Sequence, residues 1–228
     1  MHQYFISLVN MRLQISKIIL PVICSICVCT SNSEAAELKK SNYEKQSNEM
    51  GIVLIDVSWG RKWGCAQYEN AQLESLQFDN ISSDEMGRNE YTQIKLESPY
   101  RIFVDKRFIN YGFIVEPGKY AFTEWVVKVA KSVRDVSYRK AGREQLVDGK
   151  EYHGGTFEVG AGEIVYIGNI FLDCYDSPIP WRYYTEGKEN YRTQVKQYKS
   201  KFKFLKNKEI TYRLLDTKNY GSKYSLPK

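Results

Sequence analysis

A pair of glycines in the middle of the chain has the spacing that opens a dinucleotide-binding loop. Gly160 and Gly162 fit the first two positions of G-x-G-x-x-G, which binds a pyrophosphate where a strand turns into a helix. Val165 holds the third glycine position, and the residues around it favour a strand over a helix start. We therefore predict a turn between strands at 156–159 and 163–172, without a phosphate site.

Four carboxylates near these strands could act in pairs. Asp173 and Asp176 flank Cys174, and Glu158 and Glu163 flank the glycine turn. Paired acids hydrolyse glycosidic bonds or bind calcium when the fold holds them at a suitable separation. Spacing along the chain does not set that separation, so an envelope hydrolase that acts on a glycan is an alternative prediction.

Histidine is scarce in this chain. Only His153 lies beyond the N-terminal leader described below, in a predicted loop, and nothing near it resembles a nucleophile elbow. Zinc sites usually take several histidine or cysteine ligands. We therefore predict no catalytic residue, no metal site and no cofactor.

The first 35 residues have the layout of a secretory signal. Arg12 and Lys17 precede an apolar stretch at 18–28, which is followed by polar residues. The stretch is shorter than the roughly 20 residues that a membrane-spanning helix needs. Small residues at Ser33 and Ala35 predict cleavage after Ala35, so the protein is expected in the periplasm or cell envelope.

A lipid anchor is the alternative for this leader, because Cys24, Cys27 and Cys29 lie near the end of the apolar stretch. A lipidation signal has a small residue just before its cysteine, whereas these three follow isoleucine or valine. Both interpretations place the chain outside the cytoplasm.

Removal of the leader leaves two cysteines, Cys65 and Cys174. An even pair in an exported protein predicts a disulfide, which would contribute about 3 to 5 kcal/mol by closing a long loop. Two buried free thiols are the alternative.

The body of the chain is predicted to be mainly β. We expect a flexible tether at 36–50 and a single β-sandwich domain at 51–186, with strands at 52–59, 93–96 and 101–104. The strands at 52–59 and 163–172 are apolar on both faces, which predicts central strands covered on both sides.

A proline-glycine pair predicts a hairpin within this domain. Pro117 and Gly118 favour a tight turn between strands at 113–116 and 120–129. The side chains expected to face the core share one parity: Ala121, Thr123, Trp125, Val127 and Val129.

The C-terminal part, 187–228, differs in kind. Apolar residues at helical spacing predict one amphipathic helix over 188–202 that covers the outer face of the central strand. Alternation in the same region would instead make a lysine-edged strand. A last strand at 210–215 and a loose tail at 220–228 should follow.

This C-terminal part is also strongly basic, with twelve lysines and arginines against three acids. Lys196, Lys199 and Lys203 could bind an anionic lipid, an acidic envelope polymer or an acidic protein. Export removes the usual nucleic-acid partners. A solvated helix face that binds nothing is the alternative.

The segment 177–186 has the composition of a contact surface. Its prolines keep it out of a central strand, so its aromatic and basic side chains could contact a protein or a sugar. These are Trp181, Arg182, Tyr183 and Tyr184. Alternatively, the same side chains close the end of the sandwich over the core.

Two motifs carry a resemblance to known proteins. The first is Pro117-Gly118-x-Tyr120-x-Phe122, and the second runs from Phe157 through Val159 and Ala161 to Gly168. Together they resemble a group of exported bacterial proteins, many of them lipoproteins. The resemblance implies an immunoglobulin-like or transthyretin-like β-sandwich and implies no catalytic residues.

These observations together favour a non-enzymatic binding or scaffolding module of the cell envelope. Its expected partner is an envelope protein or an anionic envelope polymer or lipid. The glycan hydrolase, and an adaptor that docks on anionic envelope surfaces, are the alternatives.

Overall fold

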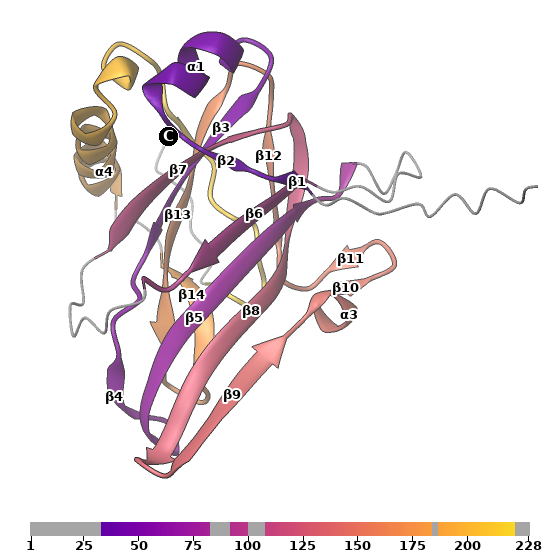
Figure 1. The fold of residues 1–228 in the computed structure, drawn as a ribbon, viewed down its shortest axis with the longest axis vertical. Coiled ribbons are helices and arrows are strands. Elements are labelled where there is room, and N and C mark those ends of the chain that lie inside the picture. The colour runs from indigo at the N-terminus through magenta and orange to yellow at the C-terminus, as the bar shows by residue number, and fades with distance from the viewer. Residues whose placement is uncertain (1–32, 83–91, 100–107, 184–186, 222–228) are drawn as a thin grey trace, which may run out of the picture.

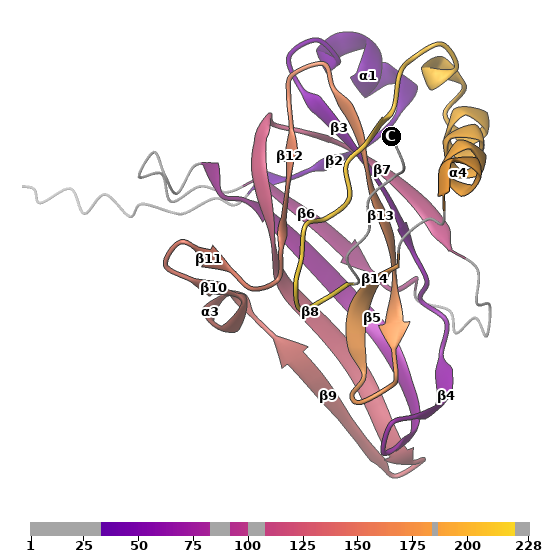
Figure 2. The ribbon, with the colours of Figure 1, turned by 180° about the vertical axis from the view of Figure 1, so that it is seen from behind.

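The computed structural model describes residues 33–82, 92–99, 108–183 and 187–221. The chain is mainly β, as predicted, and its strands form two open sheets that enclose a common core (Figures 1 and 2). The predicted leader up to residue 32, the predicted strand at 101–104, Tyr184 and the tail beyond 221 lie outside the described residues.

The first sheet has the strand order β1-β6-β5-β8-β12, with β4 pairing β5 and β9 pairing β8. Its strands are β1 (Ser33–Glu34), β4 (Lys62–Cys65), β5 (Tyr68–Asn80), β6 (Thr92–Glu97), β8 (Gly118–Ser132), β9 (Asp135–Ala141) and β12 (Thr156–Val159).

The second sheet has the order β14-β13-β3-β7-β2, with β15 pairing β13. Its strands are β2 (Ala36–Glu37), β3 (Gly51–Val57), β7 (Ile109–Val115), β13 (Ile164–Asp173), β14 (Ile179–Tyr183) and β15 (Thr211–Tyr212). All residues of β3 are buried, and β13 lies beside it at the centre of the sheet. The prediction of central strands covered on both sides is confirmed.

The main core lies between the two sheets and is rich in aromatic rings. Phe78 of β5 contacts Phe122 of β8 and Phe157 of β12, with ring centroids 5.1 and 5.9 Å apart. Tyr120 stacks on Phe157 at 5.3 Å. Burial of such rings contributes most of the stability of a core of this kind.

A second, smaller core covers the outer face of the second sheet. Helix α4 (Gly187–Lys201) and the 3-10 helix η1 (Lys203–Leu205) bring Tyr198 and Leu205 onto Leu54 and Tyr166. The predicted C-terminal helix is therefore present on the predicted face. The chain also contains α1 (Lys40–Gln46), α3 (Arg143–Leu146) and a two-stranded ribbon of β10 (Val147–Asp148) and β11 (Glu151–Tyr152), so the prediction of one helix was incomplete.

A buried carboxylate fastens helix α4 to the sheet. Asp56 of β3 accepts hydrogen bonds from the Tyr198 hydroxyl at 2.5 Å, the Asn110 side-chain amide at 2.5 Å and the Tyr166 hydroxyl at 3.0 Å. The Tyr166 hydroxyl also contacts the side-chain oxygen of Asn169. Burial raises the pKa of Asp56, although these donors act in the opposite direction.

A bulge in β13 brings two of these partners together. Tyr166 pairs with Leu54 and Asn169 pairs with Asp56, so β13 has one residue more than β3 over this stretch. Gly168, in the extra length, has φ +110°, a conformation that glycine adopts readily. Without the bulge, Tyr166 and Asn169 would point to opposite faces of the sheet.

The predicted hairpin at Pro117 is wrong. Strand β7 pairs with β3 and β2 in the second sheet, whereas β8 pairs with β5, β9 and β12 in the first. The proline-glycine turn therefore carries the chain from one sheet to the other. The main-chain N–H of Lys119 donates to the Ser82 hydroxyl at 2.8 Å, which holds the start of β8 against the end of β5.

The glycine turn at 160–162 makes the same kind of crossing, because β12 belongs to the first sheet and β13 to the second. Gly162 has φ +72°, and the Glu163 carboxylate accepts a hydrogen bond from the Gly160 main-chain N–H at 2.9 Å. A strand follows the turn, as predicted, and not the helix that a dinucleotide site requires.

The predicted inward face of β8 is correct only beyond Thr123. Trp125, Val127 and Val129 belong to the main core, but before that point Tyr120 and Phe122 face it. Glu124 and Phe122 of β8 pair with two consecutive residues of β5, so Thr123 between them is an extra residue in β8. This bulge reverses which parity points inward.

The expectation of a flexible tether at 36–50 also needs correction. Strand β2 pairs with β7, and α1 follows it. Leu38 is buried in the second core. The sequence did not indicate this contact, because a single leucine after polar residues gives no periodic signal.

The chain end differs from the sequence prediction as well. The predicted strand at 210–215 is reduced to β15, which pairs in parallel with β13. Tyr220, expected in a loose tail, packs against Phe122 and Trp125 with ring centroids 5.6 and 6.4 Å apart.

We expect Asp56→Asn to be at least as stable as the wild type at pH 7, because its carboxamide keeps the acceptor and adds a donor for Tyr166. Asp56→Leu should lose about 2 to 5 kcal/mol, since it leaves buried hydroxyl and amide groups without their acceptor. Urea denaturation of both variants measures the two free energies of unfolding.

The pH dependence separates charge from packing. Because the folded-state pKa of Asp56 is raised, the folded state holds a proton that the unfolded state releases, and wild-type stability should fall as pH rises from about 4 towards the raised value. The Asp56→Asn variant should lack this decline. An equal decline in both proteins would contradict the assignment.

Candidate functional site

The disulfide predicted between Cys65 and Cys174 is present, with the two Cα atoms 4.7 Å apart. Cys65 ends β4 in the first sheet, and Cys174 directly follows β13 in the second. The bond therefore joins the two sheets at one end of the molecule, which we call the disulfide end. Turns β4–β5, β8–β9 and β13–β14 lie together at this end (Figures 1 and 2).

Large apolar side chains are exposed at the disulfide end. Val133, in the β8–β9 turn, is 93% exposed, Tyr175 after the disulfide is 87% exposed, and Trp63 of β4 is 60% exposed. The Arg61 guanidinium lies over the Trp63 ring at 5.8 Å from its centroid. Exposed apolar groups gathered in this way are typical of contact surfaces.

Most of the described part of the predicted contact segment 177–186 forms β14, at the edge of the second sheet. Trp181 is half-buried in β14, the edge strand of the second sheet, which agrees with the proline argument. Arg182, predicted as a binding residue, is only 5% exposed, and burial lowers its pKa. Its main-chain N–H donates to Tyr220, because the chain end covers this strand. Of Tyr183 only the strand backbone is described, where it pairs with Asn169.

The predicted basic residues remain at the surface. Lys196 on α4 and Lys203 on η1 are exposed, and Lys199 on α4 is partly exposed. The side chain of Lys201 instead donates to the main-chain carbonyl of Asn110, so it ties the helix to β7.

The four predicted acids do not come together in one site. Glu163 forms an ion pair with Arg213 at 2.7 Å, and Arg213 also donates to the main-chain carbonyl of Glu158 at 2.9 Å. Asp173 accepts from the Tyr175 main-chain N–H at 3.4 Å. These contacts hold the glycine turn and the disulfide loop in place. Asp176 is exposed.

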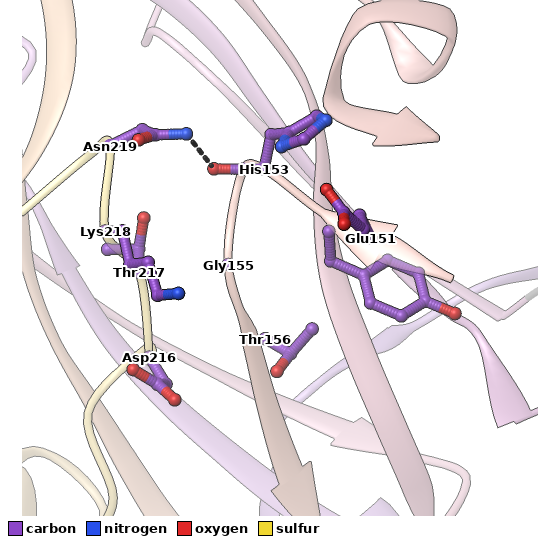
Figure 3. Close-up of a pocket in the computed structure, with 9 residues that line it drawn as sticks. Glu151, His153, Gly155, Thr156, Asp216, Thr217, Lys218 and Asn219 are labelled. Atoms are coloured by element: carbon purple, nitrogen blue, oxygen red, sulfur yellow. Dashed lines mark hydrogen bonds between the residues drawn. The ribbon is translucent and has the colours of Figure 1, made fainter. Parts of the chain in front are cut away.

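A pocket that the sequence did not predict lies beside His153. It has a volume of about 360 Å³ and is lined by Glu151, Tyr152, His153, Gly155, Thr156, Asp216, Thr217, Lys218 and Asn219. The segment before β12 forms one wall and the chain segment after β15 forms the other (Figure 3). Glu151 belongs to the first of these segments and Asp216 to the second.

Main-chain hydrogen bonds fix these two walls. Thr156 and Asp216 exchange N–H to carbonyl bonds of 2.9 and 2.8 Å, and the Asn219 side chain donates to the His153 carbonyl at 3.3 Å (Figure 3). Gly155, with φ +97°, lets the two segments approach closely, because a Cβ there would stand 2.4 Å from the Asp216 carbonyl oxygen. The walls come from distant parts of the sequence, so no local motif could have predicted them.

Within the residues that the structure describes, no group of three or more histidine, cysteine or acidic side chains is placed to hold a metal ion. Nor is any helix there long and apolar enough to cross a membrane. No family model, curated protein or solved structure matches the chain.

Removal of the disulfide tests its contribution to the disulfide end. We expect the double variant Cys65→Ala/Cys174→Ala to lose about 3 to 5 kcal/mol of unfolding free energy, because the bond closes a loop of 109 residues in sequence separation. Urea titrations with and without reductant measure this loss. Reductant should destabilise the wild type and leave the double variant unchanged; equal stability of both proteins would contradict the prediction.

Proposed function

We propose that this protein is an exported binding module of the cell envelope, built as a β-sandwich of the immunoglobulin or transthyretin kind. In this proposal the disulfide end contacts a partner protein. The observation that carries it is the exposure of Trp63, Val133 and Tyr175 on segments that meet at the disulfide end.

Apolar surface exposed to water is unfavourable in free energy. The free energy falls when a partner covers large aromatic groups that were exposed to water. Tryptophan, tyrosine and arginine dominate the binding energy at protein interfaces. Arg61 over the Trp63 ring adds a group of that kind. A disulfide beside the surface keeps it in one shape, which lowers the entropy lost on binding.

The disulfide also supports the proposed compartment. Structural disulfides persist in oxidising compartments, and the N-terminal pattern of a charged region, an apolar stretch and small residues is that of an export signal. Docking to an anionic envelope polymer or lipid through the exposed Lys196 and Lys203 and the partly exposed Lys199 is compatible with this proposal.

One observation favours a second candidate function, hydrolysis of an envelope glycan. Glu151 and Asp216 both line the pocket beside His153, one on each wall, and paired carboxylates carry out this reaction at suitable separations. The alternative drawn from the sequence named other acids, Asp173 and Asp176 with Glu158 and Glu163.

A photo-crosslinking residue at position 175 tests the contact surface in intact cells. We expect a discrete adduct with an envelope protein, lost when Trp63→Ala is added, because binding depends on the same exposed surface. Gel mobility and mass spectrometry of the adduct provide the measurement. The same residue at the exposed position 148 on β10, outside the disulfide end, is the matched control. No adduct at 175, or one unaffected by Trp63→Ala, would contradict the proposal.

The glycan alternative is tested with soluble peptidoglycan fragments. For a binding module we expect no reducing ends above background after incubation with the wild-type protein. Release that disappears in both Glu151→Gln and Asp216→Asn, but persists in Glu158→Gln, would establish the hydrolase instead. A reducing-sugar assay on the four proteins measures this.

A further inference from the structure

Strand β9 forms a margin of the first sheet. One of its edges pairs with β8, from Ala141 opposite Trp125 to Asp135 opposite Ser132. No strand pairs with the other edge within the part of the chain that the structure describes, and Figure 1 shows this edge at the outside of the molecule. We call it the free edge. Unpaired edge strands present main-chain donors and acceptors to any strand that can align with them.

The side chains of β9 divide into two different faces. Val136 and Tyr138 are 45% and 61% exposed and lie on the outer face of the sheet, opposite Ala130 and Lys128 of β8. The other face carries Asp135, Ser137 and Arg139. The outer face therefore has two neighbouring apolar side chains followed by Lys140, and the other face has one acid and one base on either side of Ser137.

We propose that a second copy of this chain pairs with the free edge, antiparallel, with a twofold axis at Ser137. The assembly would be a symmetric dimer whose two first sheets form one continuous sheet. This surface begins beside the β8–β9 turn of the disulfide end, but the proposal does not depend on the proposed function.

Symmetry restricts the possible registers. A twofold axis perpendicular to the sheet keeps every side chain on its own face, so residues that oppose each other must have the same parity. With the axis at Ser137, Val136 faces Tyr138 of the second copy, and Asp135 faces Arg139 of the second copy. Each contact occurs twice, so apolar side chains meet apolar side chains and each acid meets a base.

The neighbouring register lacks this match. An axis at Tyr138 would place Val136 opposite Lys140 and Asp135 opposite Ala141, with no ion pair across the interface. The register at Ser137 produces one kind of like-charged pair, Arg134 with Lys140 of the second copy, at the outer ends of the paired segment, where Arg134 belongs to the turn before β9. Self-complementarity of this kind favours a second copy over an unrelated strand.

The intramolecular contacts of Arg139 do not prevent this pairing. Arg139 donates to the Tyr68 hydroxyl within the chain. Tyr68 belongs to β5, on the other side of β8 from the free edge, so in the dimer the Arg139 guanidinium exchanges this neutral hydroxyl for the carboxylate of Asp135, with which hydrogen bonds are stronger.

Charge reversal tests the register by sedimentation of the full chain. We expect wild-type protein to sediment as a dimer of the 26.6 kDa chain. Asp135→Arg should weaken dimerisation by roughly tenfold or more, because the new arginine of each copy then faces Arg139 of the other copy. The double variant Asp135→Arg/Arg139→Asp should restore the dimer. Asp148→Arg, the same charge change on exposed β10, is the matched control and should behave as the wild type.

Crosslinking tests the position of the axis with a substitution that leaves folding intact. Ser137→Cys should form an intermolecular disulfide under mild oxidation, identified by mass spectrometry as a peptide joining the two 137 positions. Lys140→Cys should not, because its two copies lie six residues apart in the proposed register. A monomeric wild type, a dimer insensitive to charge reversal, or equal crosslinking at 137 and 140 would each overturn the proposal.

Discussion

The structure depends on the burial of both faces of two neighbouring strands, β3 and β13. One face builds the core between the sheets, and the other must be covered by something outside the sandwich. Helix α4, η1 and the segment around Leu38 supply that cover from opposite ends of the chain. The N-terminal and C-terminal parts are therefore integral to the fold, although their polar composition resembles that of surface appendages.

Asp56 shows how a polar group can position such a cover. Apolar contacts alone would let α4 slide or rotate on the sheet, whereas one carboxylate with donors from β7, β13 and α4 fixes a single arrangement. This arrangement removes the Asp56 carboxylate from water, and that burial raises its pKa. At the far end, the disulfide fixes the sheets relative to each other by a covalent bond, and the exposed aromatic groups lie on that rigid frame.

Sequence patterns predicted the features that depend on local composition. Continuous apolar runs identified the two-faced strands, helical spacing identified α4, and counting cysteines identified the bond between Cys65 and Cys174. Turn chemistry at Pro117 located a turn but not which sheet the next strand joins, because that choice depends on distant pairing. Bulges at Thr123 and Gly168 reversed the inward face, and alternation cannot register one extra residue. The sequence did not predict the pocket beside His153, because its walls meet only in the folded chain.

The short strands β1 and β2 have a consequence for the order of maturation. β1 pairs with the first sheet and β2 with the second, and between them the Ala35 N–H donates to the Gln93 carbonyl at 2.7 Å. A peptidase needs an extended, accessible backbone, and here the bond after Ala35 lies clamped between two sheets. A peptidase that cuts this bond would therefore have to act before β1 and β2 pair with the two sheets.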